Sequence, residues 1–251
     1  MKYIIITGAS RGLGESITRK LISPGNCLFC ISRKKNNQLL SIAKNNGVNL
    51  VYFGYDLNCL EGIEALVDDI FSKVDKSNIE SICLINNAGV ISPIKRIEKC
   101  KSNEIINNFK INLISPILLT SLFARYTNDF NIKKRVINIS SGAAKKPYYG
   151  WSCYCSAKSG LDLFTKCVRT EQENKEYPIK IVSFIPGVMD TNMQEEIRAC
   201  QSEDFIQIER FKSFKEEGKL LSPDFVSEKV VELLNSEDFG QSEIFDIKDY
   251  L

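Results

Sequence analysis

Residues 3–14 read YIIITGASRGLG, a short apolar run followed at once by a loop that contains three glycines. The run is too short for a signal peptide and breaks at Thr7-Gly8, which indicates a buried strand. Glycines allow a tight turn and let backbone N–H groups approach a phosphate, and a helix that begins beyond the loop adds free donors. The spacing Gly-x3-Gly-x-Gly therefore predicts a dinucleotide site between a strand and a helix, with a plain tight turn as the alternative.

The remaining chain repeats this alternation of short apolar runs and amphipathic stretches. The expected strands lie at residues 3–6, 27–31, 50–53, 82–85, 136–139, 179–185 and 243–245, and the expected helices at 12–22, 36–46, 60–74, 98–127, 152–174 and 223–235. Runs that are apolar on both faces are typical of a parallel sheet that helices cover on both sides. We therefore predict an α/β fold of the Rossmann type, a doubly wound parallel sheet of about seven strands in three layers, as one domain over residues 1–251.

The stretch 190–221 interrupts the alternation, because it is long, charged and carries scattered large apolar residues such as Met193, Phe205, Phe211 and Phe214. Sheets of this kind bind their ligands beyond the carboxyl ends of the strands. We expect this insertion to form a lid over a substrate.

Composition excludes several classes of function. The 33 basic and 31 acidic residues nearly balance, which argues against nucleic acid as a partner. No apolar run approaches the ~20 residues of a membrane span, so we expect a soluble cytoplasmic protein. The chain has no histidine, which removes Ser-His-Asp hydrolysis and the usual zinc sites. Nine cysteines without a secretory signal indicate free thiols, and we expect Cys27 and Cys30 to pack in the core rather than bind a metal.

The charge at the end of the second expected strand indicates which nucleotide binds. Enzymes that use NAD often carry an acid there, whereas an arginine accommodates the 2′-phosphate of NADP. Here the strand ends in Ser32-Arg33-Lys34, and Arg11 in the glycine loop could reach the same phosphate. We therefore predict NADP(H), with a solvated basic turn as the alternative.

Tyr154 and Lys158 are four residues apart, so on a helix they share one face. A free tyrosine titrates near ~10, and a fixed ammonium close to the phenol favours the phenolate. Lowering the pKa by about three units needs about 4 kcal/mol, which the lysine and an oxidised nicotinamide could supply together. In isolation such a pair is more often an ordinary helix surface.

Further motifs, in addition to the glycine loop, resemble those of the short-chain dehydrogenase/reductase family in order and spacing across essentially the whole chain. They are Asn86-Asn87-Ala88-Gly89, Asn112 within Ile111-Asn112-Leu113, Ser140-Ser141, Tyr154-Cys155-Ser156-Ala157-Lys158 and Pro186-Gly187. The resemblance implies that Ser141 donates a hydrogen bond to the substrate carbonyl and that Tyr154 protonates it. It also implies that Asn112 holds a water of the proton relay, although this side chain could instead bond only to backbone, and that Lys158 bonds the nicotinamide ribose.

The resemblance further implies a set of cofactor-binding positions and a homodimer or homotetramer. The cofactor positions are Gly8, Ser10, Arg11, Gly12, Leu13, Gly14, Arg33, Asp56, Asn87, Ala88, Gly89, Tyr154, Lys158, Pro186, Gly187, Val188 and Thr191. Asp56 would bond the adenine ring, but an N-cap for the next helix explains it nearly as well. The subunits would pair through the helices at 98–127 and 152–174, whose apolar residues Leu118, Leu119, Leu122 and Phe123 fit a core face equally.

Within the family, residues 150–155 and 186–194 look like those of sepiapterin reductases, and residues 140–151 and 245–248 are similar to those of bacterial benzil reductases. Both groups reduce one carbonyl of a vicinal dicarbonyl or a related α-oxo ketone. The expected substrate contacts are Ser141, Trp151, Tyr154, Met189 and Met193. Sepiapterin reductases anchor their pterin with an aspartate near the C-terminus, for which Asp246 and Asp249 are candidates.

Other functions stay open at this point. The chain could be a 3-oxoacyl or other small-ketone reductase, or an NADP-binding regulator without turnover. The intact set Asn112, Ser141, Tyr154 and Lys158 argues against a regulator, since a sensor does not need all four. A nucleotide-sugar epimerase or dehydratase would need a longer substrate domain than 251 residues allow.

Overall fold

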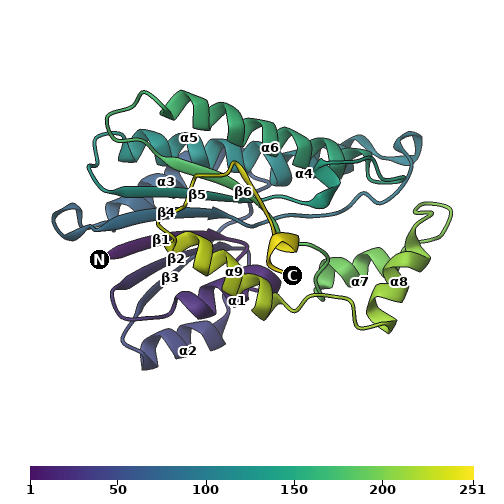
Figure 1. Cartoon of the computed structure of the whole chain (residues 1–251), viewed down its shortest axis with the longest axis horizontal. Coiled ribbons are helices and arrows are strands. Elements are labelled where there is room, and N and C mark those ends of the chain that lie inside the picture. The colour runs from purple at the N-terminus through teal and green to yellow at the C-terminus, as the bar shows by residue number, and fades with distance from the viewer.

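The computed structural model describes the whole chain, residues 1–251, and has the three-layer α/β architecture expected from the sequence. Seven parallel strands form one sheet in the order β3-β2-β1-β4-β5-β6-β7 (Figure 1). The strands are β1 (Lys2–Thr7), β2 (Asn26–Ser32), β3 (Asn49–Gly54), β4 (Ser81–Asn86), β5 (Lys133–Ile139), β6 (Lys180–Ile185) and β7 (Ile244–Asp246). The strand order reverses between β1 and β4, and such a switch point is where these sheets bind ligands.

Helices cover both faces of the sheet (Figure 1). On one face lie α1 (Gly12–Leu21), α2 (Asn37–Asn45) and α9 (Pro223–Asn235), and on the other α3 (Ile63–Ser72), α4 (Ser102–Phe109), α5 (Ser115–Thr127) and α6 (Ser152–Gln172). Two short helices, α7 (Asn192–Arg198) and α8 (Ile208–Glu216), project beyond the sheet at one end. Both come from the segment 190–221 that interrupts the sequence pattern.

The alternation of side chains explains why the strands are apolar throughout. In β1, Ile4 and Ile6 pack into the core on the α1 side, whereas Tyr3 and Ile5 pack into the core on the α3 side. In β2, Cys30 faces the first core and Cys27 the second. The two thiols therefore point to opposite faces of the sheet, which confirms that they are core residues and cannot share one metal ion.

The prediction of one long helix over residues 98–127 is wrong in two respects: the helix begins later, and it is not continuous. Residues Ile97–Lys99 form an isolated 3-10 turn, and α4 begins only at Ser102. A π-helical turn, Lys110–Ile114, then separates α4 from α5. Pro116 in the first turn of α5 has no N–H to donate to the carbonyl of Asn112, so regular α-helical bonding cannot run through this point.

The segment Ser102–Thr127 is long and apolar enough, by length and composition only, to cross a membrane. In the fold it is instead a helical layer against the sheet, where Leu119, Leu122 and Phe123 of α5 are buried in the core on the α3 side. Only 39 % of its most apolar window is buried, so part of its apolar surface faces outward.

Candidate active site

A cleft of about 680 Å³ opens beyond the carboxyl ends of β1, β2, β4 and β5, at the reversal of strand order. Most of the cofactor positions expected from the sequence line it. The exceptions are Gly14, Gly187 and Val188, which lie outside the lining. Residues far apart in the sequence therefore meet in one cleft, from the glycine loop at one end to Tyr154 and Lys158 at the other.

The glycine loop is shaped to receive a phosphate. Gly8 and Gly12 have φ angles of +68° and +57°, in the left-handed region that favours glycine. A Cβ on Gly14 would lie 2.3 Å from the carbonyl oxygen of Gly8, so only glycine lets α1 begin this close to the loop. The Arg11 side chain does not cap α1, which leaves first-turn N–H groups of the helix free for an anion.

The basic residues Arg11, Arg33 and Lys34 line this same end of the cleft, and none of them forms an ion pair with a carboxylate. The Asn36 side chain joins the two segments that carry them, because its Nδ2 donates to the Ser10 carbonyl over 3.1 Å. Sequence reasoning missed Asn36, whose signal was its position as the N-cap of α2. The glycine loop and the segment after β2 therefore present positive charges without an ion-pair partner beside the phosphate site.

Asp56 lines the cleft but is not the N-cap of the next helix, because Cys59 caps the 3-10 turn Leu60–Gly62 and Gly62 caps α3. It lies at the end of β3, and one carboxylate oxygen accepts a bond of 3.0 Å from the N–H of Asn58. The other carboxylate oxygen of Asp56 accepts no hydrogen bond in this turn.

Asn87 fixes the ends of β1 and β4 together. Its Nδ2 donates to the Thr7 carbonyl over 2.9 Å, and the Thr7 hydroxyl accepts from the N–H groups of Asn87 and Ala88 over 2.9 and 3.0 Å. Thr7, which was not predicted from the sequence, therefore fixes the backbone of Asn87 and Ala88 where they line the cleft.

Tyr154 and Lys158 lie one turn apart near the start of α6 and are both buried, at 6 % and 4 % exposure. The Lys158 ammonium lies 5.9 Å from the centre of the Tyr154 ring and donates to the Ile139 carbonyl over 2.8 Å. A Cβ on Gly89 would lie 3.8 Å from Lys158 Nζ and 3.1 Å from Asn112 Oδ1. The loop after β4, the π-helical turn and α6 therefore converge at this end of the cleft.

Burial controls the protonation of this pair. It raises the pKa of Tyr154 to about 12, and the nearby Ser141 hydroxyl opposes the rise only in part. Burial also lowers the pKa of Lys158 to about 8, while Asp162, one turn further along α6, acts in the opposite direction. In the protein alone desolvation raises the pKa of the tyrosine, and the lowering expected from Lys158 together with an oxidised nicotinamide stays a prediction. Tyr154 is a protonated phenol at neutral pH and can donate a proton.

The Asn112 side chain bonds only to backbone, which was the alternative reading of this residue. Its Oδ1 accepts from the N–H of Val90 over 3.0 Å, and its Nδ2 donates to the Val90 carbonyl over 2.8 Å. This side chain therefore shapes the loop after β4, and its role in a proton relay stays a prediction.

The expected substrate residues separate into two groups. Met189 and Met193 line the cleft beside Tyr154, whereas Ser141 and Trp151 do not line it. Ser141 still lies close enough to influence the Tyr154 phenol.

Trp151 as a substrate contact is a prediction that the structure corrects. Its indole is 4 % exposed and packs between the Tyr154 ring at 5.8 Å and the Phe205 ring at 4.8 Å. Phe205 and Phe211 of the segment 190–221 are also buried, so this segment closes onto α6 through aromatic packing.

Two polar residues near the reactive end were not expected from the sequence. Glu196 of α7 lines the cleft, and its carboxylate accepts a hydrogen bond from the Ser92 hydroxyl in the loop after β4. By contrast, neither candidate for a pterin anchor lines the cleft. Asp246 pairs with Lys145 over 3.0 Å, and Asp249 is exposed.

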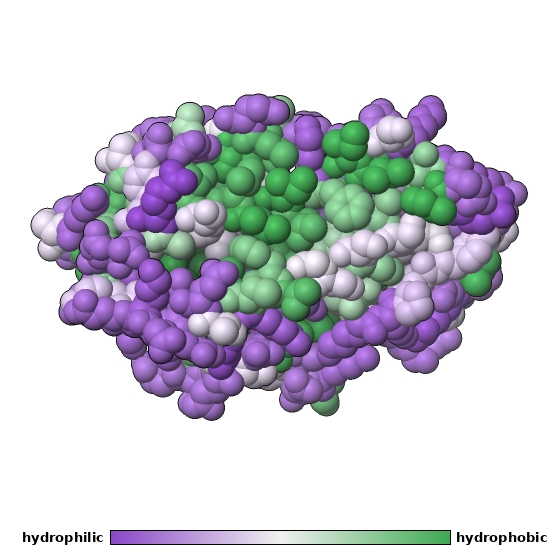
Figure 2. Space-filling view, turned by 90° about the horizontal axis from the view of Figure 1, so that it is seen from above, coloured by the Kyte–Doolittle hydropathy of each residue, from purple (hydrophilic) through white to green (hydrophobic).

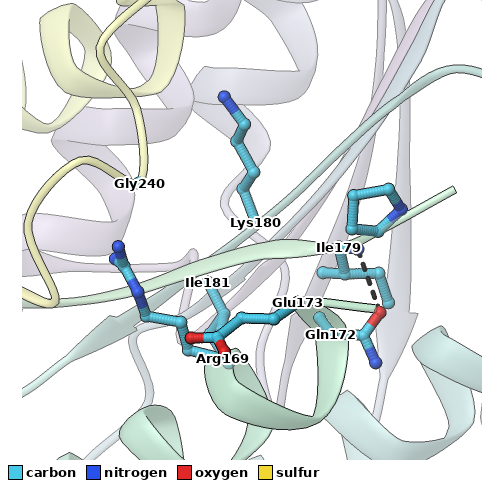
Figure 3. A pocket seen from close by; sticks show the side chains of 8 residues that line it. Arg169, Gln172, Glu173, Ile179, Lys180, Ile181 and Gly240 are labelled. Atoms are coloured by element: carbon cyan, nitrogen blue, oxygen red, sulfur yellow. Dashed lines mark hydrogen bonds between the residues drawn. The ribbon is translucent and has the colours of Figure 1, made fainter. Parts of the chain in front are cut away.

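A second, smaller hollow of about 160 Å³ lies at the opposite end of the sheet, where β6 begins (Figure 3). Arg169, Gln172 and Glu173 of α6 line it together with Lys180, and Gln172 accepts a bond of 3.1 Å from the N–H of Ile179. None of the residues expected for chemistry lies there, so the cleft at the switch point is the candidate active site.

Comparison with known proteins finds related sequences and structures. A family model described as short chain dehydrogenase matches residues 2–202. A benzil reductase ((S)-benzoin forming) of Bacillus cereus is 47 % identical over 98 % of this chain and 99 % of its own length. A sepiapterin reductase of Rattus norvegicus is 27 % identical over 98 % of this chain and 95 % of its own. Among solved structures, the KRED1-Pglu enzyme is similar with a TM-score of 0.81 and 28 % identity, covering 96 % of this chain and 98 % of that one.

Proposed function

This chain belongs to the short-chain dehydrogenase family and is a carbonyl-reducing oxidoreductase, and we propose that it uses NADPH to reduce one carbonyl of an aromatic or bulky α-dicarbonyl to a hydroxyketone. The observation that carries the proposal is the single cleft that joins an uncompensated basic phosphate site to a buried tyrosine–lysine pair. The similarity to a benzil reductase over almost the full length supports the choice of substrate.

Different residues of the cleft would bind different parts of NADPH. The glycine loop and the first turn of α1 would bind the pyrophosphate, and Arg11 and Arg33 would bind the 2′-phosphate. Asp56 would bond the adenine ring with its unused oxygen, and Thr191 with Pro186 would border the nicotinamide. When bound, the reduced nicotinamide supplies the hydride.

The protein itself supplies the proton. Ser141 donates a hydrogen bond to the substrate carbonyl oxygen, and Tyr154 transfers its phenolic proton to that oxygen as negative charge develops there. The electron pair of the broken O–H bond stays on the Tyr154 oxygen. Lys158, whose ammonium lies one helix turn away, stabilises the resulting phenolate by its charge.

The lining near Tyr154 favours an uncharged, flat substrate. Val90, Ile111, Met189 and Met193 border this part of the cleft, and burying an unpaired charge against them would be costly. The segment 190–221, packed onto α6 by Phe205 and Phe211, would act as the lid above it.

An NADPH-consumption assay tests this function directly. Benzil and 1-phenyl-1,2-propanedione should be reduced at one carbonyl to a hydroxyketone of one predominant configuration, measured by chiral chromatography. Acetoacetyl thioesters are the comparison substrates. Faster turnover of the thioesters, or a racemic hydroxyketone, would contradict the proposed substrate class.

We propose an assembly and a location for the protein from its apolar helical face and its free cysteines. Figure 2 looks down on the layer of α4, α5 and α6 and shows apolar side chains gathered across it. The exposed apolar residues Ile106 of α4, Ile114 of the π-helical turn and Leu163 of α6 belong to the elements of this layer. We propose that a second copy of the chain covers this face in a homodimer or homotetramer. All nine cysteines are free thiols, which suits a reducing compartment such as the cytoplasm.

A further inference from the structure

The charges that line the cleft are unevenly distributed. Arg11, Arg33 and Lys34 are grouped at the phosphate end. At the reactive end the lining has only two charged side chains, the buried Lys158 and the exposed Glu196. Lys158 belongs to the proton-donating pair, so Glu196 is the one charge there that the proposed reaction does not use.

Glu196 lines the reactive end of the cleft beside Met193. It lies one turn after Met193 on α7, and residues three apart share a helix face, so both border the same part of the cleft. The Ser92 hydroxyl donates a hydrogen bond to its carboxylate from the loop after β4. This bond joins two segments on either side of the reactive end and fixes the position of the carboxylate.

The charge of Glu196 is not neutralised by a neighbour. No lysine or arginine forms an ion pair with it, although the adjacent segments contain many such pairs, for example Lys215 with Asp190. A hydroxyl such as that of Ser92 orients a carboxylate but leaves its full negative charge in place. Glu196 therefore brings a negative charge without an ion-pair partner to the reactive end of the cleft.

We propose that Glu196 is a specificity-determining residue that excludes anionic carbonyl compounds, such as 2-oxo acids, and leaves neutral α-dicarbonyls as substrates. This inference rests on the proposed function and adds the charge of the substrate to it. Repulsion between two negative charges several ångström apart in a partly solvated cleft weakens binding by about 3- to 30-fold. The effect falls as salt is added, because the carboxylate is exposed to solvent.

A matched pair of substrates isolates this effect. 1-Phenyl-1,2-propanedione is neutral, whereas phenylglyoxylate carries a carboxylate in place of the acetyl group and keeps the same aromatic ketone. The value of kcat/KM with NADPH is measured for both in the wild type and in Glu196→Gln. The ratio of phenylglyoxylate to diketone should rise by about 3- to 30-fold in the variant, and less at high salt.

Glu195→Gln is the control, because it removes the same charge from the neighbouring position of α7. Glu195 is exposed but does not line the cleft, so the ratio should stay at the wild-type value. An unchanged ratio in Glu196→Gln, or an equal rise in both variants, would overturn the proposal.

Calorimetry separates this inference from the proposed function. The dissociation constant of phenylglyoxylate for the complex with NADP+ should fall in Glu196→Gln by the same factor as the kinetic change, without any turnover. If the wild type does not reduce the diketone, the proposed function fails while the calorimetry still decides the role of Glu196. Equal dissociation constants in wild type and variant, or no binding to either, would refute the role.

Discussion

The indole ring of Trp151 stacks on the phenyl ring of Phe205, with centroids 4.8 Å apart and an angle of 6° between the planes. Trp151 immediately precedes α6, whereas Phe205 lies between α7 and α8. The same indole also meets the edge of Tyr154 at 5.8 Å. One side chain therefore links the lid to the proton donor, and it is the only tryptophan in the chain.

Replacing Phe205 by alanine should loosen the lid. Truncating a fully buried phenylalanine costs about 3–5 kcal/mol, and here the loss falls on the contact between lid and body. We expect a higher KM for the diketone and a red shift of the tryptophan emission in the folded protein. Phe239→Ala, which removes an equally buried ring from the core on the α1 side, should lower stability without that shift. Unchanged emission in Phe205→Ala would contradict the linkage.

Replacing Tyr154 by phenylalanine removes only the phenolic oxygen. NADPH should bind almost normally, while turnover falls by orders of magnitude because the transition state loses its proton donor. Tyr148→Phe is the matched control on the same aromatic cluster and should stay active. Fluorescence titration with NADPH and steady-state rates check both parts. Retention of a tenth of the activity would mean that another group donates the proton.

Arg33→Asp should change the choice of nucleotide. A charge-assisted bond to a phosphate contributes about 1.5–3 kcal/mol, so kcat/KM for NADPH should fall by about 10- to 150-fold. The value for NADH should fall less or rise, since NADH has no 2′-phosphate. Lys35→Asp, one residue beyond the lining of the cleft, is the control. A variant that still prefers NADPH would show that Arg33 does not bind this phosphate.

Lys158→Met should stabilise the protein at neutral pH while it abolishes turnover. Burial lowers the pKa of Lys158 to about 8, whereas an unfolded lysine keeps its proton up to about 10.4. Below pH 8 both states are protonated and the folded state bears the full cost of the buried charge, about 3 kcal/mol. Between pH 8 and about 10.4 only the unfolded state binds the proton, so this cost disappears as the pH rises.

Urea unfolding at pH 7, 9 and 10 checks the prediction for Lys158. The free energy of unfolding of the variant should exceed that of the wild type by about 2–3 kcal/mol at pH 7, because the lost bond to the Ile139 carbonyl offsets part of the gain. The difference should shrink toward pH 10. A difference that does not depend on pH would disprove the linkage to this proton.

Leu163→Glu should separate the subunits. Leu163 is 62 % exposed on α6, so the substitution leaves the fold of one chain intact. Light scattering should show a smaller species than the wild type. Ile206→Glu is the matched control, because Ile206 is also 62 % exposed but lies in the lid. A monomeric wild type would refute the assembly itself.

Much of this fold could be predicted because its signals are local. The apolar runs of the strands and the four-residue spacing of Tyr154 and Lys158 are visible in short windows of the sequence. The inward position of Trp151 was not predictable, since it precedes α6 in a loop and its partner Phe205 is distant in the chain. The pairing of Ser92 with Glu196 spans 104 residues, so no local pattern indicates it. The high pKa of Tyr154 likewise depends on burial that only the assembled fold creates.

The π-helical turn at Lys110–Ile114 has a consequence for the orientation of the two helices that it joins. Each residue advances an α-helix by about 100° around its axis, so one extra residue in a turn changes the rotational phase of everything that follows. The turn lets α4 direct Asn108 toward the backbone of Ile91 and Ser92, while α5 directs Phe123 into the core. Deleting one residue from it would rotate α5 by about 100° relative to α4 and turn one of these two faces away from its partner.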